Sequence, residues 1–210
     1  MPSDILLIFI KNPILGKVKT RLAKDLGDEK ALQVYEALLE MTRKTVRCSG
    51  VENWLYYSDF IDENDGFEVA SFCKKRQIQS LNLGCRMKDA FKEAFDAGAQ
   101  RVVIIGSDCP ELTQAHIDDL FCSLRKNKLA ICPAQDGGYI ALGMSAFLPT
   151  LFEGIDWSNE YVFEQTLERY KQQVGSLSGV VSLKPLRDLD DYADWHYHTK
   201  QGIFHKIVNF

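Results

Sequence analysis

Short runs of apolar residues recur along the chain and predict buried strands. The first run, Ile5–Ile10, is continuously apolar, which is typical of a strand buried on both faces of a parallel sheet. Helices are expected where apolar positions recur at helical spacing. The predicted strands cover 5–10, 54–57, 101–106, 129–132, 139–144 and 180–183. The predicted helices cover 28–47, 66–75, 86–97, 113–124, 159–171 and 190–198.

The alternation of strands and helices predicts an α/β fold with a mostly parallel central sheet covered by helices on both faces. No internal repeat and no linker rich in Pro, Gly or Ser divides the chain, so one domain over residues 1–210 is expected. Open parallel sheets bind ligands outside the carboxyl ends of their strands. The informative segments are therefore those that follow Ile10, Ile105 and Cys132.

Composition narrows the classes of function. Lys and Arg number 25 and Asp and Glu 29, so the net charge is −4 and supplies no global field to hold nucleic acid. The six cysteines form no Cys-x-x-Cys pair and are expected to be reduced. The six-residue run Ile5–Ile10 is too short for a secretory signal or a membrane span. We therefore expect a cytoplasmic protein with no membrane span and no nucleic-acid partner.

The segment that follows the first predicted strand is basic, and it predicts phosphate binding. Cations and free backbone N–H groups beside a glycine are what a phosphate group requires. The alternative is a solvated basic loop. A Walker loop is excluded because Lys11 stands where its first glycine belongs and Val18 follows Lys17. The candidate phosphate ligands are Lys11, Gly16, Lys19, Thr20 and Arg21.

The second exit, Gly106-Ser-Asp-Cys-Pro110, places an acid at the tip of a buried strand. Asp108 there faces the predicted basic loop, where a hard divalent cation can bridge a diphosphate. The alternative role of Asp108 is a helix cap or a turn residue.

The third exit holds Asp136, Gly137 and Gly138 between two apolar runs, which is an ordinary hairpin signal. Asp136 would also lie at the same sheet edge as Asp108, and the glycines would let a sugar pack against the backbone. Farther along, the acids of 188–194 can supply a second metal ligand or begin a helix.

Three further features allow two interpretations each. Trp157 can stack on a base or sugar, or pack within a loop or core. His196 and His198 can ligate a metal if their segment is extended, or lie at the surface or the rim of a site, which is the interpretation that we favour. The apolar tail Ile203–Phe210 either docks on the domain or forms a homodimer contact.

Six short motifs in order make the chain resemble the bacterial GT-A-like family of glycosyltransferases, or nucleotide-diphospho-sugar transferases, of undefined substrate. That family is related to molybdopterin and phospholactate guanylyltransferases. The resemblance covers nearly the whole chain. Its motifs are Lys11…Gly16-Lys-Val-Lys-Thr-Arg-Leu22, Gly84-x-Arg86-Met87, Gly106-Ser-Asp-Cys-Pro110, Pro133-Ala-Gln-Asp-Gly-Gly-Tyr139, Asp156-Trp-Ser158 and Asp188-Leu-Asp190.

The resemblance implies a three-layer Rossmann-like sandwich of the GT-A type that binds nucleotide diphosphates with Mg²⁺ or Mn²⁺. Asp108 would bind the metal, with Asp190 as second ligand, and Lys19 and Arg21 would hold phosphates. Arg86 would contact phosphate or ribose, or brace the sheet edge. The chain departs from the pattern where acids are expected, because it has Asn82 and Cys85 there.

The leading hypothesis is metal-dependent glycosyl transfer from a nucleotide-linked sugar to a small acceptor. Asp136 would orient the acceptor or act as general base, beside the metal-binding Asp108. One alternative is nucleotidyl transfer from an NTP to a phosphorylated small molecule, with release of pyrophosphate. Another is a nucleotide-binding module without catalysis. The nucleotide base, the sugar and the acceptor are not specified by these motifs.

Overall fold

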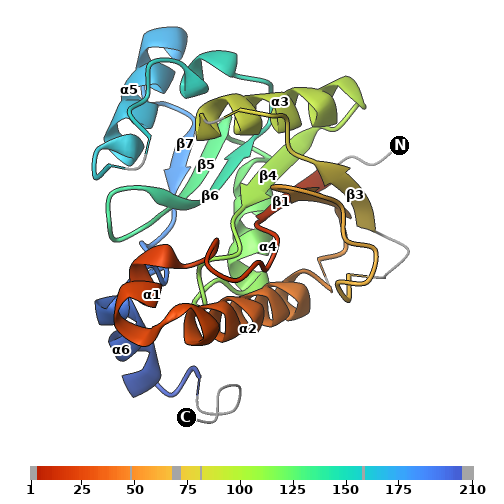
Figure 1. The fold of residues 1–210 in the computed structure, drawn as a ribbon. Coiled ribbons are helices and arrows are strands. Elements are labelled where there is room, and N and C mark those ends of the chain that lie inside the picture. The colour runs from red at the N-terminus through yellow and green to blue at the C-terminus, as the bar shows by residue number, and fades with distance from the viewer. Residues whose placement is uncertain (1–3, 48, 68–71, 81, 158, 205–210) are drawn as a thin grey trace.

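The apolar runs form a central sheet in the computed structural model, which describes residues 4–47, 49–67, 72–80, 82–157 and 159–204 (Figure 1). Within these residues seven strands are arranged in the order β3-β2-β1-β4-β6-β5-β7. The strands are β1 (Asp4–Ile10), β2 (Glu52–Tyr57), β3 (Phe72–Arg76), β4 (Arg101–Ile105), β5 (Leu129–Pro133), β6 (Tyr139–Met144) and β7 (Val180–Ser182).

The sheet is mostly parallel, as predicted. β1 pairs in parallel with β2 and β4, β2 with β3, and β5 with β7, whereas β6 runs antiparallel to both β4 and β5. The reversal follows from the Asp136-Gly-Gly turn, which joins β5 and β6 as a hairpin. The carboxyl ends of β1 and β4 therefore lie beside the amino end of β6, at one edge of the sheet.

Helices cover both faces of the sheet and complete three layers (Figure 1). One apolar core lies between the sheet and α3, α5 and the short 3₁₀ helix η1. A second core lies between the opposite face and α1, α2, α4 and α6. The helices are α1 (Thr20–Leu26), α2 (Asp28–Val46), α3 (Leu83–Asp96), α4 (Gln114–Ser123), η1 (Pro149–Phe152), α5 (Val162–Val174) and α6 (Tyr192–Lys200).

The helix predicted over 66–75 is wrong, because Phe72–Arg76 form the edge strand β3. Its side chains alternate between the two faces of the sheet. Lys74 Nζ lies 2.9 Å from Asp65 Oδ1, and Lys75 Nζ lies 4.1 Å from the centre of the Trp54 ring. Because β3 is a partly buried edge strand with the sequence Phe-Cys-Lys-Lys-Arg, it lacks the apolar run by which the other strands were predicted.

The sequence analysis did not predict α1. This helix spans seven residues and buries only Leu22, so it carries too little periodicity to be seen. Gly27 separates it from α2 with a φ of 83°, a conformation that glycine adopts at no steric cost.

Several smaller expectations can be compared with the described residues. All five cysteines among them are free, in agreement with the prediction, and Cys48 lies outside these residues. No helix in the described part of the chain is long and apolar enough to cross a membrane. Phe204 is buried and packs on Trp195, whereas 205–210 of the apolar tail lie outside the described residues.

Candidate active site

A cavity of about 800 Å³ opens at the sheet edge where β1 and β4 end and β6 begins. Its walls come from these three strands, from the first turn of α3, from 155–157 and from Asp188. This is the position at which parallel sheets bind ligands, so we take the cavity as the candidate site.

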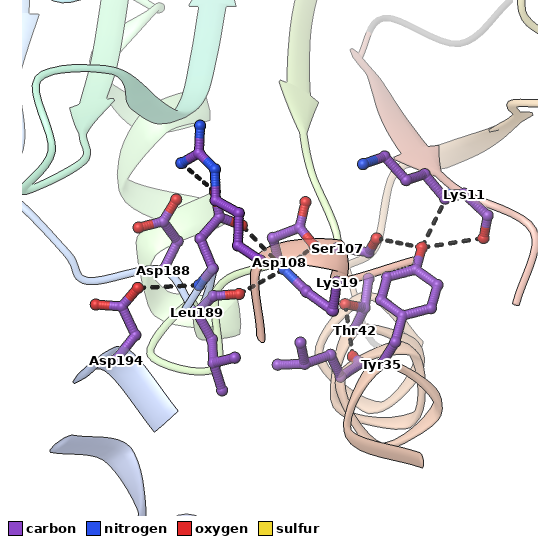
Figure 2. Close-up of polar contacts among 12 residues, drawn as sticks. Lys11, Lys19, Tyr35, Thr42, Ser107, Asp108, Asp188, Leu189 and Asp194 are labelled. Atoms are coloured by element: carbon purple, nitrogen blue, oxygen red, sulfur yellow. Dashed lines mark hydrogen bonds and ion pairs between the residues drawn. The ribbon is translucent and has the colours of Figure 1, made fainter. Parts of the chain in front are cut away.

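Asp108 lies at the tip of β4 and lines the cavity, with its side chain 40% exposed. The carboxylate forms an ion pair with the ammonium group of Lys19 (Figure 2). Burial acts to raise the pKa of Asp108, but Lys19 outweighs it and holds this pKa below its usual range. Asp108 is therefore a stable anion at the cavity wall.

Lys19 is buried and joins Asp108 to the C-terminal acidic segment. Its Nζ donates to the carbonyl oxygen of Leu189 at 2.5 Å and to Asp190 Oδ1 at 3.3 Å. Burial lowers the pKa of Lys19, but Asp108 and Asp190 raise it above its ordinary value. The backbone at Lys19 is left-handed, with φ 47°. This lysine therefore faces carboxylates, and it is not among the described residues that line the cavity.

The other candidate phosphate ligands of the basic loop differ in whether they line the cavity. Lys11 is exposed and lines the cavity. Gly16, Thr20 and Arg21 are exposed and are not among its described lining residues. Arg21 Nη1 lies 3.8 Å from Asp190 Oδ2. Of the candidate phosphate ligands in this loop, the structure thus brings Lys11 to the cavity.

Tyr35 of α2 joins the ends of β1 and β4, a role that the sequence analysis did not find. Its hydroxyl group accepts from the Lys11 N–H at 2.8 Å and lies 3.0 Å from the Ser107 Oγ (Figure 2). It also donates to the Lys11 carbonyl oxygen at 3.0 Å. Burial raises the pKa of Tyr35, so the hydroxyl stays protonated. The two strand ends are thereby fixed relative to each other beneath Asp108.

Arg86 lines the cavity from the first turns of α3. Its Nη1 donates to Gln77 Oε1 at 2.6 Å, while its Nε is buried with no partner among the described residues. Gln77 in turn donates to the Tyr56 carbonyl oxygen at 3.0 Å, so the arginine is held at the end of β3. Burial lowers the pKa of Arg86 below its ordinary value.

The departure from the family pattern at 82 and 85 has a structural role. Asn82 is the N-cap of α3, and its Oδ1 accepts from the Cys85 N–H at 3.1 Å. Asn is among the preferred N-cap residues because its side chain satisfies a free backbone donor.

Asp136 lies in the β5–β6 turn, where its Oδ1 accepts from the Gly138 N–H at 2.9 Å. It is not among the described residues that line the cavity, whereas Asp188 is. Burial, followed by the charges of Asp136 and Asp190, raises the pKa of Asp188 to about 7. Of the acidic pair 188 and 190, the member that faces the cavity is therefore Asp188, while Asp190 contacts Lys19 and Arg21.

The acids farther along begin a helix, which was one of the two expectations. Asp191 is the N-cap of α6, and its Oδ1 accepts from the N–H groups of Ala193 and Asp194. His196 is exposed, as expected, but the prediction that His198 lies at the surface is wrong. His198 is fully buried, and its Nε2 lies 3.1 Å from the Asp188 carbonyl oxygen. This contact links α6 to the acidic segment.

The donor set fits a small divalent cation. Asp108 and Asp188 both line the cavity and offer hard carboxylate oxygens. The raised pKa of Asp188 reports repulsion among carboxylates as well as burial, and a cation would relieve that repulsion. No three metal-ligating side chains converge within the described residues. Such a site suits Mg²⁺, which is commonly held by one or two carboxylates together with substrate phosphates.

The chain has the α/β fold of nucleotide-diphospho-sugar transferase structures, with a mostly parallel seven-stranded sheet in its described residues. More narrowly, the chain belongs to the family described as an uncharacterized protein conserved in bacteria (DUF2064), whose model matches residues 41–159. No curated protein matches the chain.

Solved structures share the fold over nearly the whole chain. One of them is a proposed nucleotide-diphospho-sugar transferase from Desulfovibrio desulfuricans G20. It is 26% identical in sequence with a TM-score of 0.81, and the match covers 100% of both chains. The 4-diphosphocytidyl-2C-methyl-D-erythritol synthase of Anaerococcus prevotii DSM 20548 is 12% identical, with a TM-score of 0.59 and 95% and 98% of the two chains covered. A cytidylyltransferase of Leptospira borgpetersenii is 16% identical, with a TM-score of 0.53 and 100% and 89% covered.

Proposed function

We propose that the chain is a single-domain transferase. Its donor is a nucleotide-linked sugar, and it transfers the glycosyl group of this donor to a small acceptor. The observation that carries this proposal is the cavity itself, which places Lys11, Arg86 and Asp108 around one space. The support from relatives is the full-length likeness to the Desulfovibrio protein.

Phosphate binding falls to the cationic part of the cavity. Lys11 and Arg86 both line it, and the amino end of α3 adds a positive helix dipole. Arg86 is held by Gln77 through Nη1, which leaves the N–H groups of Nη2 for a ligand. Lys19, Arg21, Gly16 and Thr20 would shape the loop around this site rather than contact the donor.

Asp108 and Asp188 would hold Mg²⁺ or Mn²⁺, which supplies positive charge against the negative charge that develops on the departing diphosphate. Lys19 would act as a positioning residue, because its buried ammonium group pairs with the partly exposed Asp108 carboxylate. Asp188 would replace Asp190 as the second ligand, since Asp188 lines the cavity. Asp136 would support the turn rather than serve as general base.

Nucleotidyl transfer is the second candidate, favoured by the shared fold of the cytidylyltransferase from Leptospira. The same cations and acids would then bind an NTP, and pyrophosphate would leave. The two reactions differ in the product: a nucleoside diphosphate is released from a sugar donor, and pyrophosphate from a triphosphate.

The test is thermal unfolding of the full chain with a panel of nucleoside diphosphates, their sugar conjugates and triphosphates, each with and without Mn²⁺ or Mg²⁺. A ligand at a hundredfold excess over Kd stabilises by about 2.7 kcal/mol. We expect a metal-dependent rise in Tm with one nucleoside diphosphate or its sugar. A rise with triphosphates alone would favour nucleotidyl transfer, and no rise with any of them would overturn the proposal.

Lys11→Ala and Lys17→Ala form a matched pair of variants for this test. Both lysines are exposed and belong to the same loop, but of the two only Lys11 is a described lining residue of the cavity. The Lys11 variant should lose most of the ligand-induced rise in Tm, and the Lys17 variant should keep it. Equal loss in both would mean that the loop acts through its general charge.

A further inference from the structure

The side of the cavity that faces β6 has a different character from the phosphate side. Its wall consists of Tyr139, which opens β6, together with Met87 of α3 and the segment Ile155, Asp156 and Trp157. Tyr139 and Trp157 meet edge to face, with ring centres 6.4 Å apart. We call these five residues the aromatic wall.

The polar groups of the aromatic wall lack strong partners. The Tyr139 hydroxyl contacts Met87 Sδ at 4.0 Å, and a thioether is a weak acceptor. Trp157 Nε1 is buried with no hydrogen-bond partner among the described residues. The Tyr139 hydroxyl group can exchange its weak contact with Met87 for a stronger hydrogen bond to a ligand that bears hydroxyl groups.

The indole ring of Trp157 packs closely against the backbone of Gly84. A Cβ at Gly84 would lie 2.5 Å from two atoms of the indole ring, so no larger residue fits there without moving the tryptophan. Gly137 has a related role on the other side, because a Cβ there would lie 2.0 Å from the Glu160 carbonyl oxygen. The turn before β6 and the segment that carries Trp157 are thus packed together around the wall.

The aromatic wall carries a negative charge, which disfavours anions. Five charged side chains line the cavity among the described residues, and Asp156 is the one that belongs to the wall. It is exposed, and its position is fixed because its backbone N–H donates to Gln165 Oε1 at 2.9 Å. The lining cations lie elsewhere: Lys11 follows β1, and Arg86 is bonded to Gln77 at the end of β3. Arg86 adjoins Met87 in α3, but its Nη1 donates to Gln77, whose amide donates in turn to the carbonyl oxygens of Tyr56 and Ile10, so the guanidinium group lies toward the ends of β2 and β1.

We propose that the aromatic wall is a second subsite, which binds an uncharged hydroxylated ring, a sugar or cyclic polyol, and rejects its phosphorylated form. The apolar face of such a ring packs on Tyr139 and Trp157. Its hydroxyl groups donate to Asp156 and accept from the Tyr139 hydroxyl group, whose partner is the weak acceptor Met87 Sδ. The inference rests on the proposed function, which supplies two sources of such a ring: the donor sugar and the acceptor.

The test follows the indole N–H signals of the full chain by NMR, with ¹⁵N-labelled tryptophan and Trp157→Phe to assign the Trp157 signal. The chain has three tryptophans. Trp54 serves as an internal reference, because its Nε1 donates to Glu52 at 2.6 Å and it does not belong to the described cavity lining. The probes are UDP and GDP, UDP-glucose and GDP-mannose, and free D-glucose, D-mannose and myo-inositol, each beside its available phosphate ester.

A shift of the Trp157 signal with a nucleotide sugar, but not with the bare nucleotide or free sugar, would assign the wall to the donor ring. A shift with a free sugar or polyol would assign it to the acceptor. Either result supports the proposal. It is overturned if the signal moves with phosphate esters and not with neutral rings, if it moves equally with bare nucleotide, or if no probe moves it.

Variants separate this inference from the proposed function. Trp157→Ala should weaken binding of the ring about tenfold or more, yet keep the rise in Tm caused by a nucleoside diphosphate. Asp156→Asn should narrow the preference for glucose over glucose 6-phosphate, whereas Glu153→Gln should not. Glu153 is a matched control because it is exposed and close in sequence but pairs with Lys88. If nucleotides and nucleotide sugars do not raise the Tm of the wild type, the proposed function itself is contradicted.

Discussion

The two sides of the cavity differ in how their polar groups are paired. On the side of β1 and β4, Tyr35 joins Lys11 to Ser107, and Lys19 joins Asp108 to Asp190. On the side of β6, Tyr139 and Trp157 have donors without strong partners among the described residues. A paired site is preorganised for charge, whereas an unpaired site is completed by its ligand. The comparison suggests that the first side binds phosphates and metal, and the second a neutral ring.

The largest expected effect follows from Asp108→Asn, which removes the anion of the paired side. Turnover should fall by about 10²–10³-fold, because the negative charge proposed to hold the cation is lost. The fold should persist, since asparagine keeps the shape of the side chain and Lys19 retains Asp190 and the Leu189 carbonyl. Steady-state rates and circular dichroism check both statements. Full activity in the variant would rule out the metal role.

Lys19→Met tests whether pairing holds this side together. Removing the buried ammonium leaves Asp108 and Asp190 without a shared cation. Breaking a buried ion pair costs about 3–5 kcal/mol, and the half-exposed carboxylates reduce the expected loss to about 2 kcal/mol. Urea unfolding measures it. Lys24→Met, an exposed lysine in the helix α1 that begins directly after Lys19, should change the free energy of unfolding by about 0.5 kcal/mol or less.

Tyr35→Phe should cost somewhat less, about 1–2 kcal/mol of stability, because it leaves the Lys11 N–H and the Ser107 hydroxyl without their buried partner. Nucleotide affinity should fall as well, since Lys11 would lose its fixed position. Urea unfolding and calorimetric titration with a nucleoside diphosphate would check this. Unchanged affinity would mean that the strand ends are positioned without Tyr35.

Asp188→Asn should give the smallest effect, and that effect depends on pH. Folding raises the pKa of Asp188 from 3.8 to about 7, so ionising it opposes folding. Wild type and variant should be equally stable below about pH 3, where the carboxyl is protonated in both the folded and the unfolded state. As pH rises from about 4 to 7 the carboxyl ionises in the unfolded state but not in the folded state, so the wild type should lose about 1 kcal/mol relative to the variant, after allowance for screening, and the difference should level off above pH 7. Thermal unfolding in the presence of EDTA would show it, and a constant difference at all pH values would contradict it.

The central strands could be predicted because continuous apolar runs such as Ile5–Ile10 and Val102–Ile105 make them recognisable. The sequence was not sufficient for β3 or α1, which are short and bury little. The strand tip at Asp108 could be predicted, since topology alone brings it to the sheet edge. The partners of Lys19, the role of Tyr35 and the choice between Asp188 and Asp190 depend on packing between distant segments, which no local pattern records.

The central claim is that the paired side of the cavity binds a nucleoside diphosphate together with a divalent cation. The most direct measurement is the Kd of the preferred nucleoside diphosphate by calorimetry, with and without Mn²⁺, in wild type and in Asp108→Asn. We predict that Mn²⁺ lowers the Kd of the wild type about tenfold or more, which is about 1.4 kcal/mol, and leaves that of the variant nearly unchanged. An equal effect of Mn²⁺ on both proteins, or no binding by the wild type, would contradict the account.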